Sequence, residues 1–231
     1  MRVLAIETSS SRGSVALVEG TSVQDAQICG YTSHDEPNRH AERLLSMTRE
    51  VLQQASWDKR QIERVAVGLG PGSFTGVRIG IAQAQGMMLG LGASGVGIGS
   101  MSVIAAGLPF DDKRVRVVVR DARRDEFFVA AYTSTGRELL APHTIAQEGA
   151  RDRILEQFGG ESFVIVGSIL SGFDCQVGPE TTEPDARPLG RMALQASPQV
   201  DLLVPQYVRG PNVVRPNLPP SPLVGPRING G

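Results

Sequence analysis

Residues 2–19 read Arg-Val-Leu-Ala-Ile-Glu-Thr-Ser-Ser-Ser-Arg-Gly-Ser-Val-Ala-Leu-Val-Glu. Two short apolar runs, 2–7 and 13–19, flank a polar, turn-rich link of hairpin length. This pattern predicts two antiparallel strands joined by a tight connection. Residues 22–32 continue the pattern as a weaker third strand. The sequence therefore predicts a meander of three strands over residues 2–32. The elements that follow it distinguish between the folds that share such a meander.

After the meander, the spacing of apolar residues changes to three or four positions, which predicts an amphipathic helix from about 38 to 56. A strand at 62–68, a helix at about 74–91, a strand at 95–98 and a helix near 100–107 follow. Three strands followed by alternating helices and strands describe the half-domain of the actin, hexokinase and Hsp70 (ASKHA) superfamily. We therefore expect an α/β fold of two lobes, each a mixed sheet flanked by helices.

The second half of the chain repeats this order in shortened form. The expected elements are strands at 114–120, 126–133 and 137–141, a helix at about 146–158, a strand at 163–167 and a helix at 188–196. We expect an N-terminal lobe over 1–108, which contains the helices at 38–56 and 74–91, and a C-terminal lobe over 109–210. Residues 211–231 hold six prolines and two charged residues, so they are expected to form a disordered tail.

Composition narrows the classes of function. With 23 basic and 24 acidic residues the net charge is −1, which disfavours a nucleic-acid binder that acts alone. Two distant cysteines exclude a disulfide framework and fit a reducing, cytoplasmic location. Residues 79–110 carry no charge, but eight glycines and several polar residues indicate buried elements rather than a membrane span.

The turn after the first strand is a candidate nucleotide site. An acidic residue at the end of a first strand, followed by small polar residues, suits phosphate and Mg²⁺ in actin-like ATPases. The candidate residues are Glu7, Thr8, Ser9, Gly13 and Ser14. The alternative is a plain polar hairpin.

The Gly-Pro-Gly-Ser-Phe-Thr-Gly loop at 70–76 opens the helix at 74–91. It is not a P-loop, because the chain has only two lysines, Lys59 and Lys113, and neither lies in it. Small residues recur every four positions along the helix, at Gly76, Gly80 and Ala84 and again at Ala82, Gly86 and Gly90. Such a face lets another backbone approach closely. The partner is the 38–56 helix, a helix of another subunit, or both.

The histidines and the basic residues at 113–124 are two further candidate clusters. A helical metal site needs histidines four residues apart, but His40 is followed by Leu44, so no metal site is expected. The basic run Lys113, Arg114, Arg116, Arg120, Arg123 and Arg124 is interleaved with acidic residues. It is either a strand edge with ion pairs or a patch that reaches RNA.

Four motifs occur together in order: residues 5–9, 40–45, 70–80 and 121–126, followed by Pro-Gln-Tyr-Val-Arg at 205–209. In this combination they resemble the TsaB (YeaZ) family, the dimerisation subunit of the bacterial complex that makes N6-threonylcarbamoyladenosine in tRNA. The resemblance covers about residues 1–210 and implies a non-catalytic relative of the transferase TsaD. In TsaD a His-x-x-x-His helix binds metal, whereas this chain keeps His40 and has Leu44.

The resemblance also implies partners and an interface. The chain is expected to form a homodimer alone and a heterodimer with TsaD, to recruit the P-loop ATPase TsaE, and to meet tRNA mainly through the complex. ATP and metal would belong to partner subunits. The expected interface residues are His40, Leu44, Leu45, Val51, Leu52, Ser73, Phe74, Thr75, Gly76, Arg78, Gly80, Ala82 and Gly86. The alternatives are an actin-like ATP-dependent enzyme, such as a small kinase, and a metallopeptidase.

Overall fold

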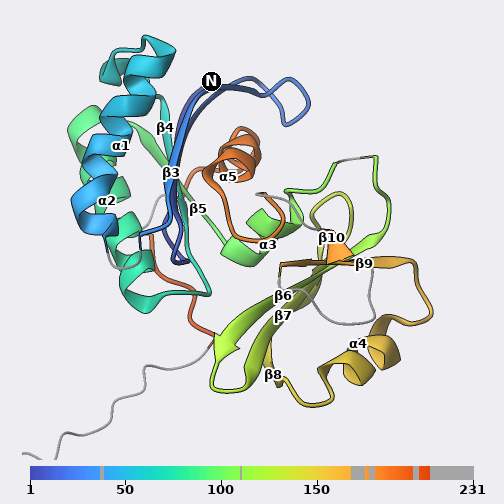
Figure 1. The fold of residues 1–231 in the computed structure, drawn as a ribbon. Helices are drawn as coiled ribbons and strands as arrows, with labels where there is room; N and C mark the ends of the chain where they lie inside the picture. Colours follow the sequence, from blue (N-terminus) through green and yellow to red (C-terminus); the bar gives the residue numbers. More distant parts are fainter. Residues whose placement is uncertain (37–38, 110, 168–174, 177–179, 200–202, 209–231) are drawn as a thin grey trace, which may run out of the picture.

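A computed structural model describes residues 1–36, 39–109, 111–167, 175–176, 180–199 and 203–208. It contains two five-stranded mixed sheets with helices packed on their faces (Figure 1). The expected two-lobed α/β fold is confirmed. The expected tail over 211–231 lies outside the described residues. Within the described residues, no helix is both long and apolar enough to span a bilayer.

The first sheet has the order β3-β2-β1-β4-β5. Its strands are β1 (Arg2–Glu7), β2 (Gly13–Glu19), β3 (Gln27–His34), β4 (Arg64–Gly68) and β5 (Ser94–Ile98). The central strand β1 pairs antiparallel with β2 and parallel with β4. Both faces of β1 are buried, and for this reason its sequence is a continuous apolar run rather than an alternating one.

The second sheet has the order β10-β9-β6-β7-β8. Its strands are β6 (Val115–Arg123), β7 (Glu126–Tyr132), β8 (Glu138–Ala146), β9 (Phe163–Gly167) and β10 (Cys175–Gln176). As in the first sheet, the strand that comes first in the chain is central, with an antiparallel meander on one side and parallel strands on the other. This equivalence confirms that the half-domain pattern recurs.

Helices α1 (His40–Ala55) and α2 (Phe74–Leu91) cover one face of the first sheet (Figure 1). Their inward side chains form one core with β1, β2 and β4, and this core includes Leu44, Met47, Val51, Val77 and Ile81. Between α1 and β4 the chain makes a short 3₁₀ turn, Lys59–Gln61. The opposite sides of α1 and α2 do not belong to this core.

The two halves exchange their last helices. Helix α3 (Ser100–Ala105) follows the first sheet but packs with Met101 and Ile104 against β6, β7 and β9. Helix α5 (Ala186–Ala193) follows the second sheet but packs with Leu189 against β1 and β2. Helix α4 (Ala150–Phe158) covers the remaining face of the second sheet. Part of the expected C-terminal lobe, 109–210, thus completes the core of the first sheet.

A buried polar cluster fixes α5 in this position. Asp185 caps the helix by accepting a hydrogen bond from the N–H of Arg187, and its side chain is fully buried. Tyr31 Oη donates a 2.7 Å hydrogen bond to Asp185 Oδ2. The N–H of Ala186 donates to Ser14 Oγ at 2.9 Å. Strands β2 and β3 therefore hold the start of α5.

Several boundaries differ from the prediction. Strand β3 begins at Gln27 rather than 22, because the Asp25 carboxylate folds Thr21 and Ser22 into a turn by accepting hydrogen bonds from both residues. These bonds hold the pKa of Asp25 below its usual value. Strand β8 continues to Ala146 instead of ending at 141. The short β10 was not predicted.

Candidate functional site

The end of β1 is built around a buried acid, Glu7. One carboxylate oxygen accepts a 2.7 Å hydrogen bond from the N–H of Ser9, and the other accepts a 3.0 Å bond from Ser100 Oγ. Burial raises the pKa of Glu7, while these hydrogen bonds and the charge of Arg120 act in the opposite direction. A Cβ at Gly68 would overlap the carboxyl group, so only glycine fits beside it. Both carboxylate oxygens therefore have partners inside this chain.

Three other residues predicted for nucleotide binding are also occupied by contacts within the chain. Thr8 Oγ1 donates a 2.8 Å hydrogen bond to the carbonyl of Gly76. Ser14 Oγ accepts a bond from the N–H of Ala186, and Gly13 lies against His34. The side chain of Ser9 is also fully buried, and its hydroxyl is one of the groups whose hydrogen bonding to Glu7 lowers the pKa of that carboxyl.

The turn at 7–14 faces a cleft of about 470 Å³. The opposite walls come from the loop before α2 and from the turn between β6 and β7. The lining residues are Ser9, Ser10, Ser11, Gly72, Ser73, Phe74, Thr75, Arg120, Asp121, Ala122, Arg123, Phe128 and Glu183. A smaller adjoining cavity of about 110 Å³ shares Ser10, Ser11, Ser73, Thr75 and Arg123 with the cleft. The cleft thus combines hydroxyl groups, two guanidinium groups, two carboxylate groups and two aromatic rings.

Glycines of the 70–76 loop and of α2 pack against the same turn. Added Cβ atoms at Gly72 and Gly76 would overlap the carbonyl oxygens of Ser9 and Thr8, and one at Gly80 would meet Thr8 Oγ1. The N–H of Ser73 also donates a 2.7 Å hydrogen bond to the Ser9 carbonyl. Both Gly76 and Gly80 are therefore buried against their own chain, and their part in a subunit interface stays a prediction.

Two histidines form a hydrogen-bonded relay beside this turn. His40 Nε2 lies 2.9 Å from the carbonyl of Ser10, and His40 Nδ1 lies 3.2 Å from His34 Nε2. His34 Nδ1 accepts from the N–H of Glu36. Because a carbonyl only accepts, this chain of bonds fixes one tautomer for each neutral ring. Burial and the neighbouring His40 lower the pKa of His34.

Outward side chains of α1 and α2 define a second candidate site. Ala82, Gly86 and Gly90 of α2 are exposed, and a Cβ at either glycine would meet no atom within 4 Å. Two large apolar side chains are also uncovered, Leu89 at 87% and Leu45 at 57% exposure. We name the surface formed by Leu45, Ala82, Gly86, Leu89 and Gly90 the α1/α2 outer face.

Three further predicted interface residues do not reach this face. His40 is buried beside Ser10, while Leu44 and Val51 lie in the core between α1 and the first sheet. Their side chains already contact their own chain, and their part in a subunit interface stays a prediction. Leu52 is partly buried against the same core. Spacing along α1 cannot show which apolar positions point inward.

A cluster at the start of α2 ties down the C-terminal segment. Arg78 Nε donates a 2.9 Å hydrogen bond to Tyr207 Oη, and its guanidinium lies 3.8 Å from the centroid of the Phe74 ring. The Phe74 and Tyr207 rings stack at 5.3 Å. The N–H of Gln206 donates to the carbonyl of Leu69. Residues 203–208 therefore lie against the loop that opens α2.

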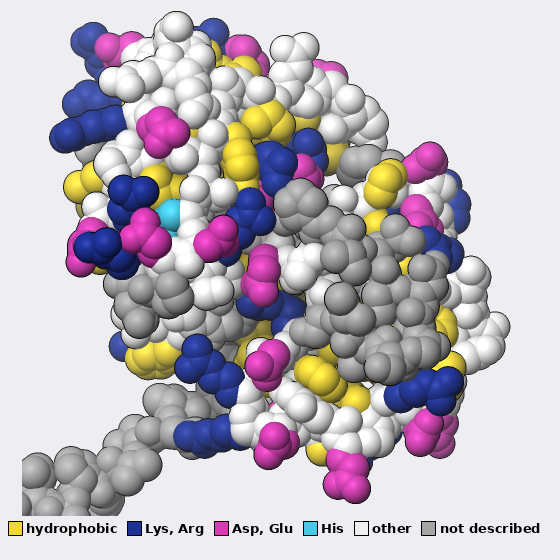
Figure 2. Space-filling view, in the orientation of Figure 1, with side chains coloured by type: hydrophobic (Ala, Val, Ile, Leu, Met, Phe, Trp, Pro, Cys, Tyr) yellow, Lys and Arg dark blue, Asp and Glu magenta, His cyan; other side chains and the backbone are white. Residues whose placement is uncertain are grey.

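The basic run does not form one positive surface. Arg114 pairs with Asp112 at 2.8 Å, Arg120 pairs with Glu183 at 2.9 Å, and Arg116 is buried with hydrogen bonds to carbonyl groups. Basic and acidic side chains are interleaved across the face shown in Figure 2. Arg123 ends β6 and Arg124 begins the β6–β7 turn, and both have positive φ angles, 62° and 56°. For Arg114 and Arg120, the structure agrees with the first alternative, a strand edge with ion pairs.

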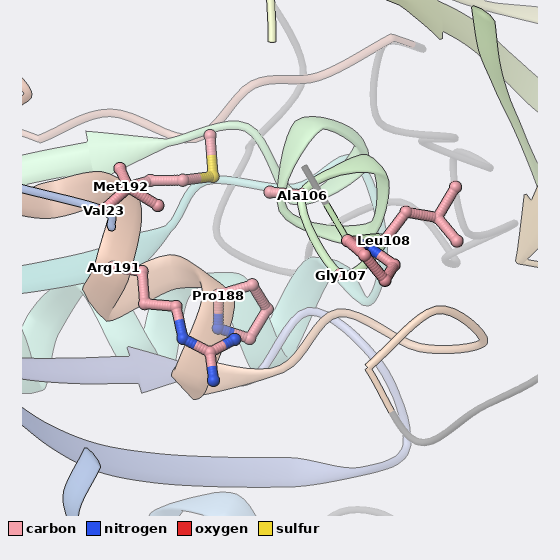
Figure 3. Close-up of a pocket in the computed structure, with 8 residues that line it drawn as sticks. Val23, Ala106, Gly107, Leu108, Pro188, Arg191 and Met192 are labelled. Carbon is pink, nitrogen blue, oxygen red and sulfur yellow. The ribbon is translucent and has the colours of Figure 1, made fainter. Parts of the chain in front are cut away.

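A third cavity, of about 310 Å³, lies between α5 and the segment after α3. In Figure 3, Pro188, Arg191 and Met192 of α5 face residues Ala106 to Leu108. Arg191 is already paired with Glu180 at 2.9 Å. This cavity is mainly apolar and lies away from the residues that the sequence singled out.

Comparison with known proteins identifies the family. The model of the TsaD family, described as tRNA N6-adenosine threonylcarbamoyltransferase, matches residues 30–157. The chain belongs to the TsaB (YeaZ) family, within this larger group. The TsaB protein of Escherichia coli is 37% identical over 134 residues, covering 57% of this chain and 55% of that protein. The TsaB protein of Bacillus subtilis is 28% identical over 132 residues, covering 57% and 55%.

The fold agrees with a solved member of the TsaB family. YeaZ from Pseudomonas aeruginosa superposes with a TM-score of 0.69 at 24% identity, covering 89% of this chain and 99% of that one. By sequence, the chain spans about half the length of the curated TsaB relatives that it matches. The family match begins in β3 and ends in α4, so it includes α1, α2 and the β6–β7 turn.

The described residues of this TsaB-family chain offer few side chains that could ligate a metal ion. The His34–His40 pair was missed in the sequence, since the two residues flank the connection between β3 and α1 instead of sharing a helix face. Among the described residues, no group of three or more histidine, cysteine or acidic side chains could hold a metal ion. All four ring nitrogens of this pair form hydrogen bonds. His40 Nδ1 and His34 Nε2 bond to each other, His40 Nε2 bonds to the carbonyl of Ser10, and His34 Nδ1 accepts from the N–H of Glu36.

Proposed function

We propose that this chain is a non-catalytic scaffold subunit in tRNA threonylcarbamoyladenosine modification. In this role it pairs with the transferase TsaD through the α1/α2 outer face and recruits the ATPase TsaE. The names of the curated TsaB relatives support the process, since they are described as tRNA threonylcarbamoyladenosine biosynthesis proteins. The α1/α2 outer face supports the mode of action.

The observation that carries the proposal is the exposed stripe of small residues on α2. Helix-interior glycines cost about 1 kcal/mol each relative to alanine. Gly86 and Gly90 have open space where a side chain would fit, so packing within this chain does not require them. A helix of a second subunit could approach closely along this stripe, with Leu45 and Leu89 adding apolar area that is exposed in the single chain.

The buried site supports a scaffold rather than an actin-like kinase. Glu7, which would bind Mg²⁺ in an actin-like ATPase, is enclosed and hydrogen-bonded to Ser9 and Ser100. Thr8 and Ser14 are likewise occupied. We accordingly assign ATP and metal chemistry to the partner subunits, and we assign to this chain the stabilisation of a competent TsaD conformation, which is a coupling of binding equilibria.

The decisive experiment uses a matched pair of glycine variants. Gly86→Leu places a large side chain on the α1/α2 outer face, whereas Gly160→Leu places it at another site with open space. Analytical ultracentrifugation with TsaD from the same genome should show heterodimers for the wild type and Gly160→Leu, and at least tenfold weaker association for Gly86→Leu. Equal association by all three proteins would reject this interface. Gly80 is unsuitable as a test site because it packs against Thr8.

A further inference from the structure

Two buried histidines join three segments of the N-terminal lobe through one line of hydrogen bonds. His40 is the first residue of α1, and its Nε2 lies 2.9 Å from the carbonyl oxygen of Ser10, in the turn between β1 and β2. Its Nδ1 lies 3.2 Å from Nε2 of His34, the last residue of β3. His34 Nδ1 accepts a 3.2 Å hydrogen bond from the backbone N–H of Glu36. The two histidines are only 7% (His34) and 3% (His40) exposed, so the relay is shielded from water.

The residues next to the relay leave room for it and depend on it. A Cβ at Gly13 would lie 2.5 Å from His34 Nε2 and 2.8 Å from His40 Nδ1, so only glycine accommodates both rings. At the start of α1, the side chain of Arg39 forms no capping hydrogen bond. The hydrogen bond from His40 to Ser10 therefore ties the first turn of α1 to the β1–β2 turn.

A proton added to either ring breaks the relay. The Ser10 carbonyl can only accept, so His40 Nε2 carries the hydrogen and the bare Nδ1 of that neutral ring accepts from His34 Nε2. A proton on His40 Nδ1 would face the N–H of His34, and a proton on His34 Nδ1 would face the N–H of Glu36. Neither ring can therefore become an imidazolium while all these hydrogen bonds persist.

Charged side chains on the surrounding elements do not offset this effect. They come from the β1–β2 turn, the β3–α1 connection, the start of α1 and the end of β6: Arg12, Asp35, Glu36, Arg39, Glu42, Arg43 and Arg123. Each of the three carboxylates among them pairs with an arginine, at distances from 3.0 to 3.9 Å. The α2 residues that border the small cavity beside His40 carry no charge. Burial and the neighbouring His40 lower the pKa of His34, so the closed relay favours two neutral rings.

We propose that the His34–His40 pair is an acid-sensitive latch, which holds the first turn of α1 against the β1–β2 turn while both rings are neutral and releases it when His34 takes up a proton. Histidine is the side chain whose charge ordinarily changes near neutral pH. In the released state the His34 imidazolium turns to solvent and donates both of its N–H groups to water. The proton favours this open state, because only the open state binds it without losing a hydrogen bond.

The latch also has a consequence for assembly. Leu45 of the α1/α2 outer face follows His40 by five positions in α1, about one and a half helical turns. Release of the first turn would therefore disturb one edge of that surface, and association through it should weaken in mild acid. This consequence rests on the proposed scaffold function, whereas the latch itself does not, since all of its groups belong to this chain.

Nitrogen-15 spectra of the histidine rings, recorded on the isolated full chain, test the closed state. At pH 7.5 both His34 and His40 should carry their hydrogen on Nε2 and leave Nδ1 bare. A hydrogen on Nδ1 of either neutral ring would contradict the hydrogen bonds of the relay and overturn the proposal. This measurement needs the wild type alone.

Amide hydrogen exchange read by mass spectrometry tests the release. After correction for the intrinsic effect of pH on exchange, residues 39–45 of the wild type should exchange about tenfold faster at pH 5.5 than at pH 7.5, while β1 keeps its rate. His34→Gln has no ring to protonate at this position, so its exchange in residues 39–45 should change less than about twofold. His143→Gln removes a histidine from β8 in the second sheet and should behave like the wild type.

Three results of the exchange experiment would overturn the latch. The first is wild-type exchange in residues 39–45 that does not depend on pH, and the second is an equal acceleration in His34→Gln. The third is an equal acceleration in β1, which would show a loss of global stability in place of a local release. Neither experiment contains TsaD, so failure of the latch leaves the proposed scaffold function untouched.

Discussion

Ser100 Oγ lies 3.0 Å from Glu7 Oε2 and donates a hydrogen bond to it, which joins the first residue of α3 to the last residue of β1. The same hydroxyl accepts a 3.1 Å hydrogen bond from the N–H of Gly70. One buried side chain thus connects β1, the loop before α2 and the helix that covers the second sheet.

Ser100→Ala should destabilise the chain more than an ordinary serine replacement. The variant leaves Glu7 Oε2 and the Gly70 N–H without this partner, so the free energy of unfolding should fall by about 1–3 kcal/mol. Urea unfolding followed by circular dichroism measures the change. Ser46→Ala on the exposed side of α1 is the control, with an expected change within about 0.5 kcal/mol. Equal effects of the two substitutions would argue against the Glu7–Ser100 link.

Two glycine-to-alanine substitutions should act in opposite directions. At Gly68 the new methyl group overlaps the Glu7 carboxyl, so we expect a loss of about 1–3 kcal/mol from overpacking. At Gly86 the methyl group meets no atom within 4 Å, and better helix propensity should add about 0.5–1 kcal/mol. Thermal and urea unfolding of the purified variants measure both signs. A stabilising Gly68→Ala would contradict the described position of Glu7.

Stability should decrease in mild acid because of the histidine relay. Burial and His40 lower the pKa of His34, so the folded chain favours the neutral ring. Below about pH 6.5 the unfolded chain then binds more protons, and stability falls until the lower folded pKa is passed. His34→Gln should lose less in melting temperature between pH 7.5 and pH 5.5 than the wild type. Parallel pH profiles for the two proteins would show that His34 does not contribute.

Tyr31→Phe should loosen α5 without unfolding the first sheet. The substitution removes the 2.7 Å hydrogen bond to the buried Asp185 and should cost about 1–2 kcal/mol. Amide hydrogen exchange should speed up mainly in residues 186–193, since Asp185 caps that helix. Tyr207→Phe also removes one hydroxyl, but from a partly exposed ring that accepts from Arg78, so α5 should exchange at the wild-type rate. Exchange that is unchanged in Tyr31→Phe would exclude this anchoring role.

Periodicity in the sequence predicted most of the elements because each one buries a regular apolar pattern. Helix α1 was found from three-to-four spacing, and β1 from a continuous apolar run. Strand β10 has only two residues, so no period can be read from it. The start of β3 was misplaced because the turn at Thr21–Asp25 depends on a carboxylate whose bonds are visible only in the fold.

The candidate sites were only partly predictable for a related reason. Gly76, Gly80 and Gly86 look equivalent in the sequence, yet the first two face the Thr8–Ser9 turn and the third faces open space. Which side of α2 turns inward is decided by contacts with residues more than sixty positions away. The His34–His40 pair likewise forms because β3 ends near the start of α1.

The exchange of α3 and α5 has a consequence for how the chain is made. During synthesis β1 leaves the ribosome long before residues 186–193, the helix that covers one of its faces. The apolar surface formed by Val3, Ala5, Ala16 and Val18 therefore stays exposed to solvent until almost all of the described chain has emerged from the ribosome. Contacts between positions so far apart in the sequence slow folding, and the intermediates that form meanwhile expose apolar surface and are prone to aggregate. We therefore expect the first half of the nascent chain to aggregate more readily than the complete chain until residues 186–193 can cover it.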